Sequence, residues 1–287
     1  MALQDPTYPA YRGATLVSGR AHQPGGTDKL IYLPCHPANG FCPSWDGLPS
    51  GCLVYLCSPN NPTGEVLTHE QLRSWIEWAK ASGSFLLFDG AYSSFIDDPS
   101  LPRSIFEVEG AHQVAIEMNS FSKRCGFTGV RLGWSVVPQQ ARFDDGMAIH
   151  PQWDRLTSLL FNGPSILAQA GGVAALTDEG LKAQQEMAAF YRANGQLLRQ
   201  AIEAAGYLCY GGRHAPFLWL DANGIASWSA FEQLLHQGEL VTIPGVGFGP
   251  AGEGFLRLSA LGHRPAVEEA AERLFHCLPQ LARQAPA

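Results

Sequence analysis

The sequence predicts an α/β fold with a mostly parallel sheet and helices on both of its faces, followed by a smaller C-terminal α+β domain. Two observations predict it. Short, almost continuous apolar runs alternate with a helical pattern over the first half of the chain, which is typical of strands covered on both faces. In the second half, one long helical pattern precedes a set of shorter segments.

Four segments of the first half have the length and composition of buried strands: "KLIYLPC" (29–35), "CLVYLCS" (52–58), "FLLF" (85–88) and "VAIEM" (114–118). The second and third of them flank a helical pattern. Its apolar stripe recurs at helical spacing and comprises Leu72, Trp75, Ile76 and Ala79. Thr68 and Gln71 form a capping box at its start, and Leu67 can pack on Leu72 as a hydrophobic staple. Strand, helix and strand together indicate a βαβ unit.

Residues 180–205 are predicted to form one long helix that ends at Gly206. Its apolar stripe comprises Met187, Tyr191, Leu198 and Ile202. Shorter segments follow: "YLCY" (207–210), "FLWLDA" (217–222), a helix near 227–236, "FLRLSA" (255–260) and a closing helix over 265–278. We therefore divide the chain into a large domain (1–179), the connecting helix (180–205) and a small domain (206–287).

The composition indicates a globular protein that acts on small molecules. Of 287 residues, 46% are hydrophobic and 16% are charged, and the formal charge of −7 does not favour nucleic-acid or membrane partners. The seven cysteines form no C-x-x-C pair, so we expect neither a metal site nor a disulfide framework. Because we see no signal peptide and no segment that could span a bilayer, we expect a cytoplasmic protein.

Polar residues follow three of the predicted strands. Asn61 lies in "CSPNNPTG" (57–64), Asp89 and Tyr92 lie in "FLLFDGAYSSF", and Lys123 lies in "NSFSKRCGFTGVRLGW" (119–134). Each has an ordinary alternative, since the asparagine could be a turn residue, the aspartate a helix cap and the lysine a solvated side chain. The carboxyl ends of parallel strands meet at one edge of a sheet, however, so we expect these residues to lie together.

Together these residues suit a cofactor that has an aldehyde, a pyridine ring and a phosphate. The Lys123 amine can form a Schiff base with the aldehyde, and Asp89 can keep the pyridine nitrogen protonated. Asn61 and Tyr92 can donate to a ring oxygen. The phosphate would be held by the residues on either side of the lysine, which are Ser120, Ser122 and Arg131.

The segments "SPNNPTG", "FDGAYSSF" and "SFSKRCGFTGVRLGW" resemble the signatures of the fold-type I aminotransferases, which depend on pyridoxal 5′-phosphate. One branch of that family, the LL-diaminopimelate aminotransferases, is similar over nearly the whole chain. The segments that carry this likeness are "LQDPTYPAY", "DPSLPRSIFEV", "FNGPSILAQAGG", "GGRHAPFLWL" and "PGVGFGPAGEGFLRLSALGHR", in that order.

The resemblance implies a role for each matching residue. It makes Lys123, Asp89 and Tyr92 catalytic and places Tyr8 against the cofactor ring. It gives substrate binding to Tyr8, Asn61, Asn162 and Arg257, with Arg257 on the substrate carboxylate and Asn162 reaching across a dimer interface. Tyr8 could instead be a core aromatic, Arg257 a surface strand residue and Asn162 a helix N-cap. The glycine-rich segment 244–255 is interpreted as a turn that positions Arg257, because it has no P-loop lysine.

The resemblance also implies an activity. A homodimer would transfer the amino group of glutamate to tetrahydrodipicolinate by a ping-pong mechanism in lysine biosynthesis, with pyridoxal 5′-phosphate as cofactor. An aminotransferase for aspartate or an aromatic amino acid is an alternative.

Relative to the family pattern, the sequence begins after an N-terminal segment that carries part of the small domain and the first strand of the large one. We therefore expect an exposed sheet edge and fewer walls around the substrate, and a non-catalytic truncated remnant is a further alternative.

Overall fold

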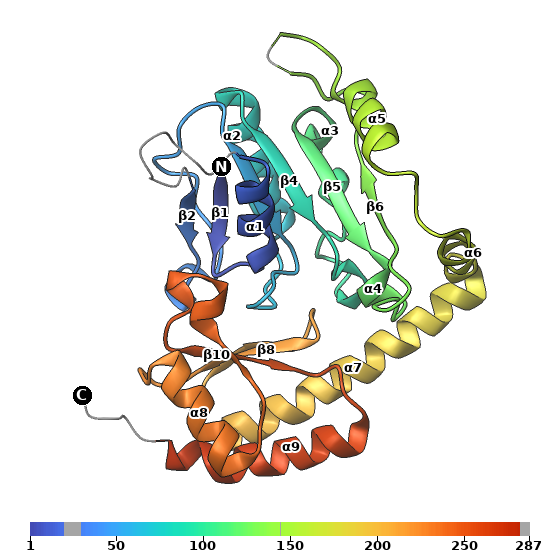
Figure 1. Ribbon diagram of the computed structural model, residues 1–287. Helices are drawn as coiled ribbons and strands as arrows, with labels where there is room; N and C mark the ends of the chain where they lie inside the picture. Colours follow the sequence, from blue (N-terminus) through green and yellow to red (C-terminus); the bar gives the residue numbers. More distant parts are fainter. Residues whose placement is uncertain (20–29, 144, 282–287) are drawn as a thin grey trace.

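The computed structural model describes residues 1–19, 30–143 and 145–281. In these residues the chain forms a larger and a smaller β-sheet, and a long helix runs diagonally beneath the first to reach the second (Figure 1). The predicted class, a mostly parallel α/β sheet followed by a smaller α+β part, is confirmed.

The larger sheet has the strand order β2-β1-β3-β4-β5-β6. Its strands are β1 (Ala2–Asp5), β2 (Ile31–Pro34), β3 (Leu53–Cys57), β4 (Phe85–Asp89), β5 (Ala115–Ser120) and β6 (Gly133–Val136). All neighbouring strands are parallel except β5 and β6, which are antiparallel. The helices of this half of the chain are α1 (Pro9–Val17), α2 (His69–Ser82), α3 (Ala111–Val114), α4 (Phe121–Arg124), α5 (Ile149–Leu160) and α6 (Ile166–Ala175).

Helices cover both faces of this sheet, as predicted. On one face, Tyr11 of α1 packs with Leu3 and Cys57. On the other, Trp75 of α2 packs with Leu56 and its neighbours in the largest hydrophobic core. Because successive side chains of a strand point to opposite sides, β3 contributes to both cores.

The start of α2 confirms the predicted capping box. The Thr68 hydroxyl accepts the backbone N–H of Gln71 at 3.2 Å, and the Gln71 side chain accepts the backbone N–H of Thr68 at 2.8 Å. Leu67 and Leu72 are both buried in the core beneath. The helix ends at Gly83, whose φ of 63° lies in the left-handed region that favours glycine.

The smaller sheet is antiparallel with the order β7-β8-β10-β9. Its elements are β7 (Cys209–Gly211), β8 (Phe217–Asp221), α8 (Ser227–Gly238), β9 (Ile243–Pro244), β10 (Phe255–Ser259) and α9 (Arg264–Cys277). Its core is closed by Leu198 and Ile202 of α7 (Asp178–Ala204), Leu234 of α8 and Leu274 of α9.

The connecting helix, α7 (Asp178–Ala204), is slightly longer than predicted. It begins at Asp178 and not at residue 180, because the Thr177 hydroxyl caps it by accepting the backbone N–H of Gly180. Of the predicted apolar stripe, Leu198 and Ile202 are buried, whereas Met187 and Tyr191 are only partly buried. The apolar stripe therefore forms a core chiefly where the helix meets the smaller sheet.

The carboxyl edge of the larger sheet packs directly on the smaller one. The backbone N–H of Thr7 donates to the Phe248 carbonyl at 2.8 Å, and the Asp5 carboxylate accepts the backbone N–H of Ala251. Gly64 lies so close to Gly211 that an added Cβ would be 2.7 Å from the Gly211 Cα. These contacts fix the relative position of the two sheets, and so determine which of their side chains face each other.

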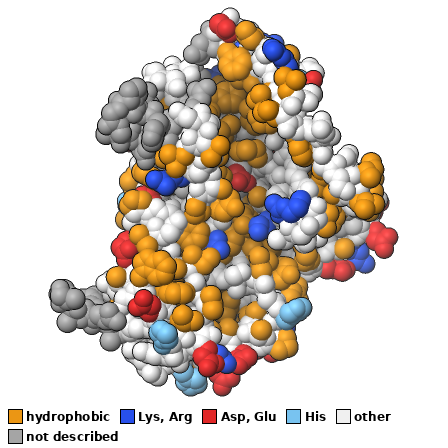
Figure 2. All heavy atoms as spheres, viewed as in Figure 1, with side chains coloured by type: hydrophobic (Ala, Val, Ile, Leu, Met, Phe, Trp, Pro, Cys, Tyr) orange, Lys and Arg blue, Asp and Glu red, His pale blue; other side chains and the backbone are white. Residues whose placement is uncertain are grey.

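One side of the molecule, which we name the α5–α6 face, is apolar and exposed. It comprises Leu159, Leu160, Phe161, Ile166, Leu167 and Val173, of which Leu167 is 80% exposed. Figure 2 shows hydrophobic side chains along this side, at the right of the view. α5 contains no buried residue. Contiguous exposed apolar surface of this kind marks a contact site.

In the part of the chain that the structure describes, no helix combines the length and the apolarity needed to cross a membrane.

We predict that Gly64→Ala weakens the docking of the two sheets. The backbone at Gly64 has a φ of +77°, which costs a residue with a side chain about 1–2 kcal/mol, and the collision with Gly211 adds about 1–3 kcal/mol. Urea denaturation should show a loss of about 2–5 kcal/mol in the free energy of unfolding.

Gly83→Ala is the matched control for Gly64→Ala. Its φ is +63°, but an added Cβ meets nothing within 4 Å. Gly83→Ala should lose only the part of the unfolding free energy that comes from the positive φ. Equal losses of unfolding free energy in the two variants would show that the close approach of Gly64 to Gly211 is unimportant.

Candidate active site

A cavity of about 450 Å³ opens where the larger sheet meets the smaller one, and we name it the central cavity. Every predicted site residue except Asn162 lines it: Tyr8, Asn61, Asp89, Tyr92, Ser120, Ser122, Lys123, Arg131 and Arg257. Figure 2 shows acidic and basic groups around a hollow in this part of the molecule. Its volume is that of a small-molecule site.

The parallel strands deliver most of these side chains. β3 ends at Cys57, ahead of the loop that carries Asn61, and β4 ends at Asp89 itself. β5 ends at Ser120, and the single turn of α4 then carries Lys123 into the cavity. Because neighbouring parallel strands end at the same edge, segments far apart in sequence meet there.

The Asp89 carboxylate is held by two donors. The Tyr11 hydroxyl donates to Oδ2 at 2.6 Å, and the backbone N–H of Ala91 donates to Oδ1 at 2.9 Å. Desolvation by burial raises the pKa of Asp89 above its ordinary value, while both hydrogen bonds act to lower it.

Arg257 reaches from β10 across the junction to the other half of the site. Its Nη1 donates to Asn61 Oδ1 at 2.7 Å, and its guanidinium lies 5.3 Å from the Phe217 ring centroid and 4.9 Å from that of Phe248. Its buried Nε has no hydrogen-bond partner among the described residues. A guanidinium held in this way can receive a carboxylate through its remaining donors, so the alternative of a surface strand residue is wrong.

The amine of Lys123 is partly buried, with its Nζ 5.9 Å from the centroid of the Tyr92 ring. Burial lowers the pKa of Lys123, and the positive charges of Arg257 and Arg131 lower it further. A larger fraction of the amine is therefore neutral near pH 7 than for a solvated lysine, and the neutral amine is the nucleophilic form.

The predicted phosphate-binding residues lie together at one end of the central cavity. The Arg131 guanidinium donates to the Ser122 hydroxyl at 3.4 Å and to the Thr128 carbonyl at 2.8 Å. Ser120 accepts the backbone N–H of Ser122 at 3.1 Å. The backbone of Arg131 is left-handed, with a φ of 68°, which is unusual for a residue other than glycine. Such strain at a cavity is typical of functional positions.

Two predicted residues lie at the periphery. Tyr8 is 45% exposed and touches the edge of Tyr11, so it is not a core aromatic. Asn162 is exposed in the segment between α5 and α6 and does not line the central cavity of its own chain. The alternative of a helix N-cap is wrong, because Ser165 caps α6. The role of Asn162 across a dimer interface stays a prediction.

Several residues at the site escaped the sequence analysis. Tyr11 and Cys57 line the cavity wall beside Asp89, and Phe217 and Phe248 flank Arg257. A signal existed for Tyr11, which ends the family-like segment "LQDPTYPAY" three positions after Tyr8. No polar motif marks the two phenylalanines, whose positions depend on the docking of the smaller sheet.

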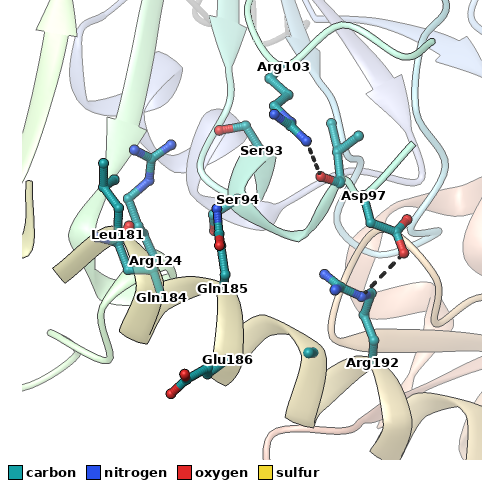
Figure 3. A pocket seen from close by; sticks show the side chains of 12 residues that line it. Ser93, Ser94, Asp97, Arg103, Arg124, Leu181, Gln184, Gln185, Glu186 and Arg192 are labelled. Atoms are coloured by element: carbon teal, nitrogen blue, oxygen red, sulfur yellow. Dashed lines mark hydrogen bonds and ion pairs between the residues drawn. The ribbon is translucent and has the colours of Figure 1, made fainter. Parts of the chain in front are cut away.

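A second hollow, of about 590 Å³, lies along α7 and shares no lining residue with the central cavity. Figure 3 shows Arg192 of α7 pointing to Asp97, and the two make an ion pair at 3.4 Å. Arg103, on the opposite wall, donates to the Ile96 carbonyl at 3.1 Å. These two arginines already have partners, and among the described residues no lysine, cysteine or histidine lines the hollow.

Comparison with known proteins shows which family the chain resembles. Residues 25–274 match the aminotransferase class I and II family. The LL-diaminopimelate aminotransferase of Protochlamydia amoebophila is 49% identical over 282 residues, which cover 97% of this chain and 69% of that enzyme. The chloroplastic LL-diaminopimelate aminotransferase of Arabidopsis thaliana is 43% identical, over 95% of this chain and 60% of its own length. This chain is therefore shorter than these relatives.

Solved structures agree with the sequence matches. The structure of L,L-diaminopimelate aminotransferase from Chlamydomonas reinhardtii superposes with a TM-score of 0.90 at 43% identity, over 95% of this chain and 68% of that one. The aromatic aminotransferase of Pyrococcus horikoshii has a TM-score of 0.84 at 24% identity, over 97% of this chain and 72% of its own, which shows a shared fold alone.

We predict that Arg131→Met raises the pKa of Lys123. A neighbouring positive charge makes protonation of the amine less favourable, so its removal favours the ammonium form. Because Arg131 is exposed, screening keeps the expected rise below about one pH unit. Competitive acetylation across a pH series, quantified by mass spectrometry, measures the midpoint.

Arg124→Met is the control, since it removes the same charge next to Lys123 in the chain while its guanidinium lies against Trp134. An equal rise of the Lys123 pKa in both variants would contradict a specific effect of Arg131.

Proposed function

Because the chain belongs to the aminotransferase class I and II family, we propose that its central cavity binds pyridoxal 5′-phosphate and transfers an amino group between an amino acid and a 2-oxo acid. One observation carries the proposal. A lysine with a lowered pKa, a partly buried carboxylate and an arginine with an unpartnered Nε face one cavity at the carboxyl ends of parallel strands.

The residues present fit this cofactor. Asp89 would pair with the pyridine nitrogen and the Lys123 amine with the aldehyde. The amide nitrogen of Asn61 is left for the ring oxygen, since its carbonyl oxygen binds Arg257, and Tyr92 lies beside it. The phosphate would lie at the end of the cavity formed by Ser120, Ser122 and Arg131, and the half-exposed Tyr8 can cover the ring.

When bound, the cofactor supplies an aldehyde and an electron-withdrawing ring that weakens the bonds to the substrate Cα. Arg257 would hold the substrate α-carboxylate in a fixed orientation. Once its amine is free, Lys123 would take the proton from the substrate Cα and deliver it to C4′, the aldehyde carbon of the cofactor. The lowered pKa of Lys123 suits it to accept that proton near neutral pH.

For the substrates, we propose the reaction of tetrahydrodipicolinate and glutamate to LL-2,6-diaminopimelate and 2-oxoglutarate, a step of lysine biosynthesis. The support is that the similar enzymes of P. amoebophila and A. thaliana are LL-diaminopimelate aminotransferases. All seven cysteines are free, which fits a reducing compartment, and we propose the cytoplasm.

We further propose that two copies of this chain associate through the α5–α6 face. Its large side chains are exposed, and it lies beside the segment that carries Asn162. A partner copy seated there would bury this apolar surface and place Asn162 at the boundary between the two chains. Asn162 would then contribute to substrate binding in the other copy.

We predict that borohydride reduction in the presence of pyridoxal 5′-phosphate attaches the cofactor to Lys123. Peptide mapping should find the label there and lose it in Lys123→Ala, while Lys80→Ala, at an exposed position, keeps it. Lys123→Ala should also lower the rate of the amino-donor half-reaction by roughly 10²–10⁴-fold, because the general base is gone.

The same half-reaction distinguishes the substrates. LL-diaminopimelate and glutamate should convert the bound cofactor faster than aspartate or phenylalanine does. Faster conversion by aspartate or phenylalanine would favour another aminotransferase. Label spread over surface lysines, with no half-reaction, would indicate a non-catalytic remnant.

We predict that the unmodified chain sediments as a dimer and that Leu167→Lys shifts it towards monomer. The charge would be buried without a partner in the proposed interface. Val241→Lys is the control, because Val241 is 82% exposed in the smaller part, away from the α5–α6 face. A monomeric unmodified chain in analytical ultracentrifugation would overturn the proposed interface.

A further inference from the structure

The geometry points to Tyr11 as the positioning residue that holds the Asp89 carboxylate ionised and in a fixed orientation. Its significance for cofactor chemistry rests on the proposed function, whereas the interaction itself can be tested in the chain without cofactor. Tyr11 is the last residue of the segment "LQDPTYPAY", in which only Tyr8 was given a role, and it lies 78 residues before Asp89 in sequence.

The side chain of Tyr11 is fixed from several directions. Its ring is buried and stacks on Tyr55, with centroids 4.7 Å apart and planes at 12°. The ring of Tyr8 packs against it in a T-shaped arrangement, with centroids 5.7 Å apart. Because the ring cannot turn away without losing these contacts, its hydroxyl stays at 2.6 Å from Asp89 Oδ2. The distance is typical of a strong hydrogen bond to a charged oxygen.

Asp89 depends on such donors, because no ion pair to it exists in the described part of the chain. The groups that face it are Tyr11 from α1, Cys57 from β3, and the Ala91 N–H and Tyr92 from the loop after β4. Burial raises the pKa of Tyr11, Cys57 and Tyr92, so all three are uncharged near neutral pH. Tyr11 is therefore a neutral donor to Asp89.

Tyr11 has two consequences for the carboxylate. A donor to the charged form favours ionisation and offsets part of the desolvation that opposes it. The hydrogen bonds to Oδ1 and Oδ2 also fix the plane of the group, since each oxygen has its own donor. A carboxylate that pairs with a ring nitrogen needs both its charge and its orientation.

The same short helix therefore serves the site twice. Tyr8, just before α1, lines the cavity where the cofactor ring would lie. Tyr11, three residues later, holds the Asp89 carboxylate by its hydrogen bond. Tyr55 supports Tyr11 from the sheet but contacts the carboxylate only through it.

The test compares Tyr11→Phe with Tyr55→Phe. Each removes one hydroxyl from the stacked pair and keeps both rings, but only the Tyr11 hydroxyl donates to Asp89. The pKa of Asp89 is measured in the chain without cofactor by ¹³C NMR of labelled aspartate side chains, with Asp89→Asn to assign its signal. Thermal unfolding checks that each variant is folded.

We expect Tyr11→Phe to raise the midpoint of the Asp89 titration by about one pH unit, a tenfold change in proton affinity. Tyr55→Phe should leave the midpoint unchanged. In the cofactor-loaded chain, Tyr11→Phe should weaken retention of pyridoxal 5′-phosphate about tenfold, measured by its dissociation constant, because the carboxylate that pairs with the ring nitrogen loses one hydrogen bond that fixes its orientation.

An unchanged midpoint in folded Tyr11→Phe, or equal shifts in both variants, would overturn the role of Tyr11. If Tyr11→Phe does not fold, 3-fluorotyrosine at position 11 replaces it. This residue keeps the ring and donates a stronger hydrogen bond, so the midpoint must fall, and a rise would contradict the proposal. Failure of the unmodified chain to bind cofactor would overturn the proposed function alone, since the Asp89 titration needs no cofactor.

Discussion

The desolvation of the Asp89 carboxylate is the constraint on which the rest of the site depends. A partly buried carboxylate at the end of a sheet strand, with no ion pair among the described residues, tends to become neutral. Here Tyr11 and the Ala91 N–H oppose that tendency. Because Tyr11 must be buried to reach the carboxylate, α1 has to pack on the sheet close to β3, and this packing also sets the position of Tyr8.

A second requirement is that two separately built sheets dock closely. Arg257 belongs to the smaller sheet, yet its partner Asn61 follows a strand of the larger one. The interface has no room for a side chain between Gly64 and Gly211, so the backbones themselves touch. Phe217 and Phe248 then hold the guanidinium from the side of the smaller sheet. Docking of the two sheets thus brings the positive charge of Arg257 into the cavity, where it lowers the pKa of Lys123.

Apolar surface is distributed unevenly over the larger part of the molecule. The β1 to β5 region is covered by helices on both faces, whereas α5 buries none of its residues. Exposed leucines at this density are costly in water unless another surface covers them. The association that we propose for the α5–α6 face would connect the stability of this region with the completion of the substrate site by Asn162.

Much of this protein could be predicted from local sequence. The capping box of α2, the strands β2 to β5 and the helices α7, α8 and α9 follow from spacing and composition, which act over a few residues. The motif residues Asn61, Asp89 and Lys123 could be placed together because parallel strands end at one edge. Their chemistry then indicated the cofactor class.

Only the tertiary structure decided which groups control those residues. The hydrogen bond from Tyr11 to Asp89 joins positions 78 apart, and that from Arg257 to Asn61 joins positions 196 apart. Neither pair shares a motif, since the contacts arise from how a helix packs on a sheet and how two sheets dock. The sequence by itself therefore determined the elements and the reactive side chains, because local patterns specify both. Packing between distant segments determined their ionisation and orientation, because burial and neighbouring donors exist only in the folded chain.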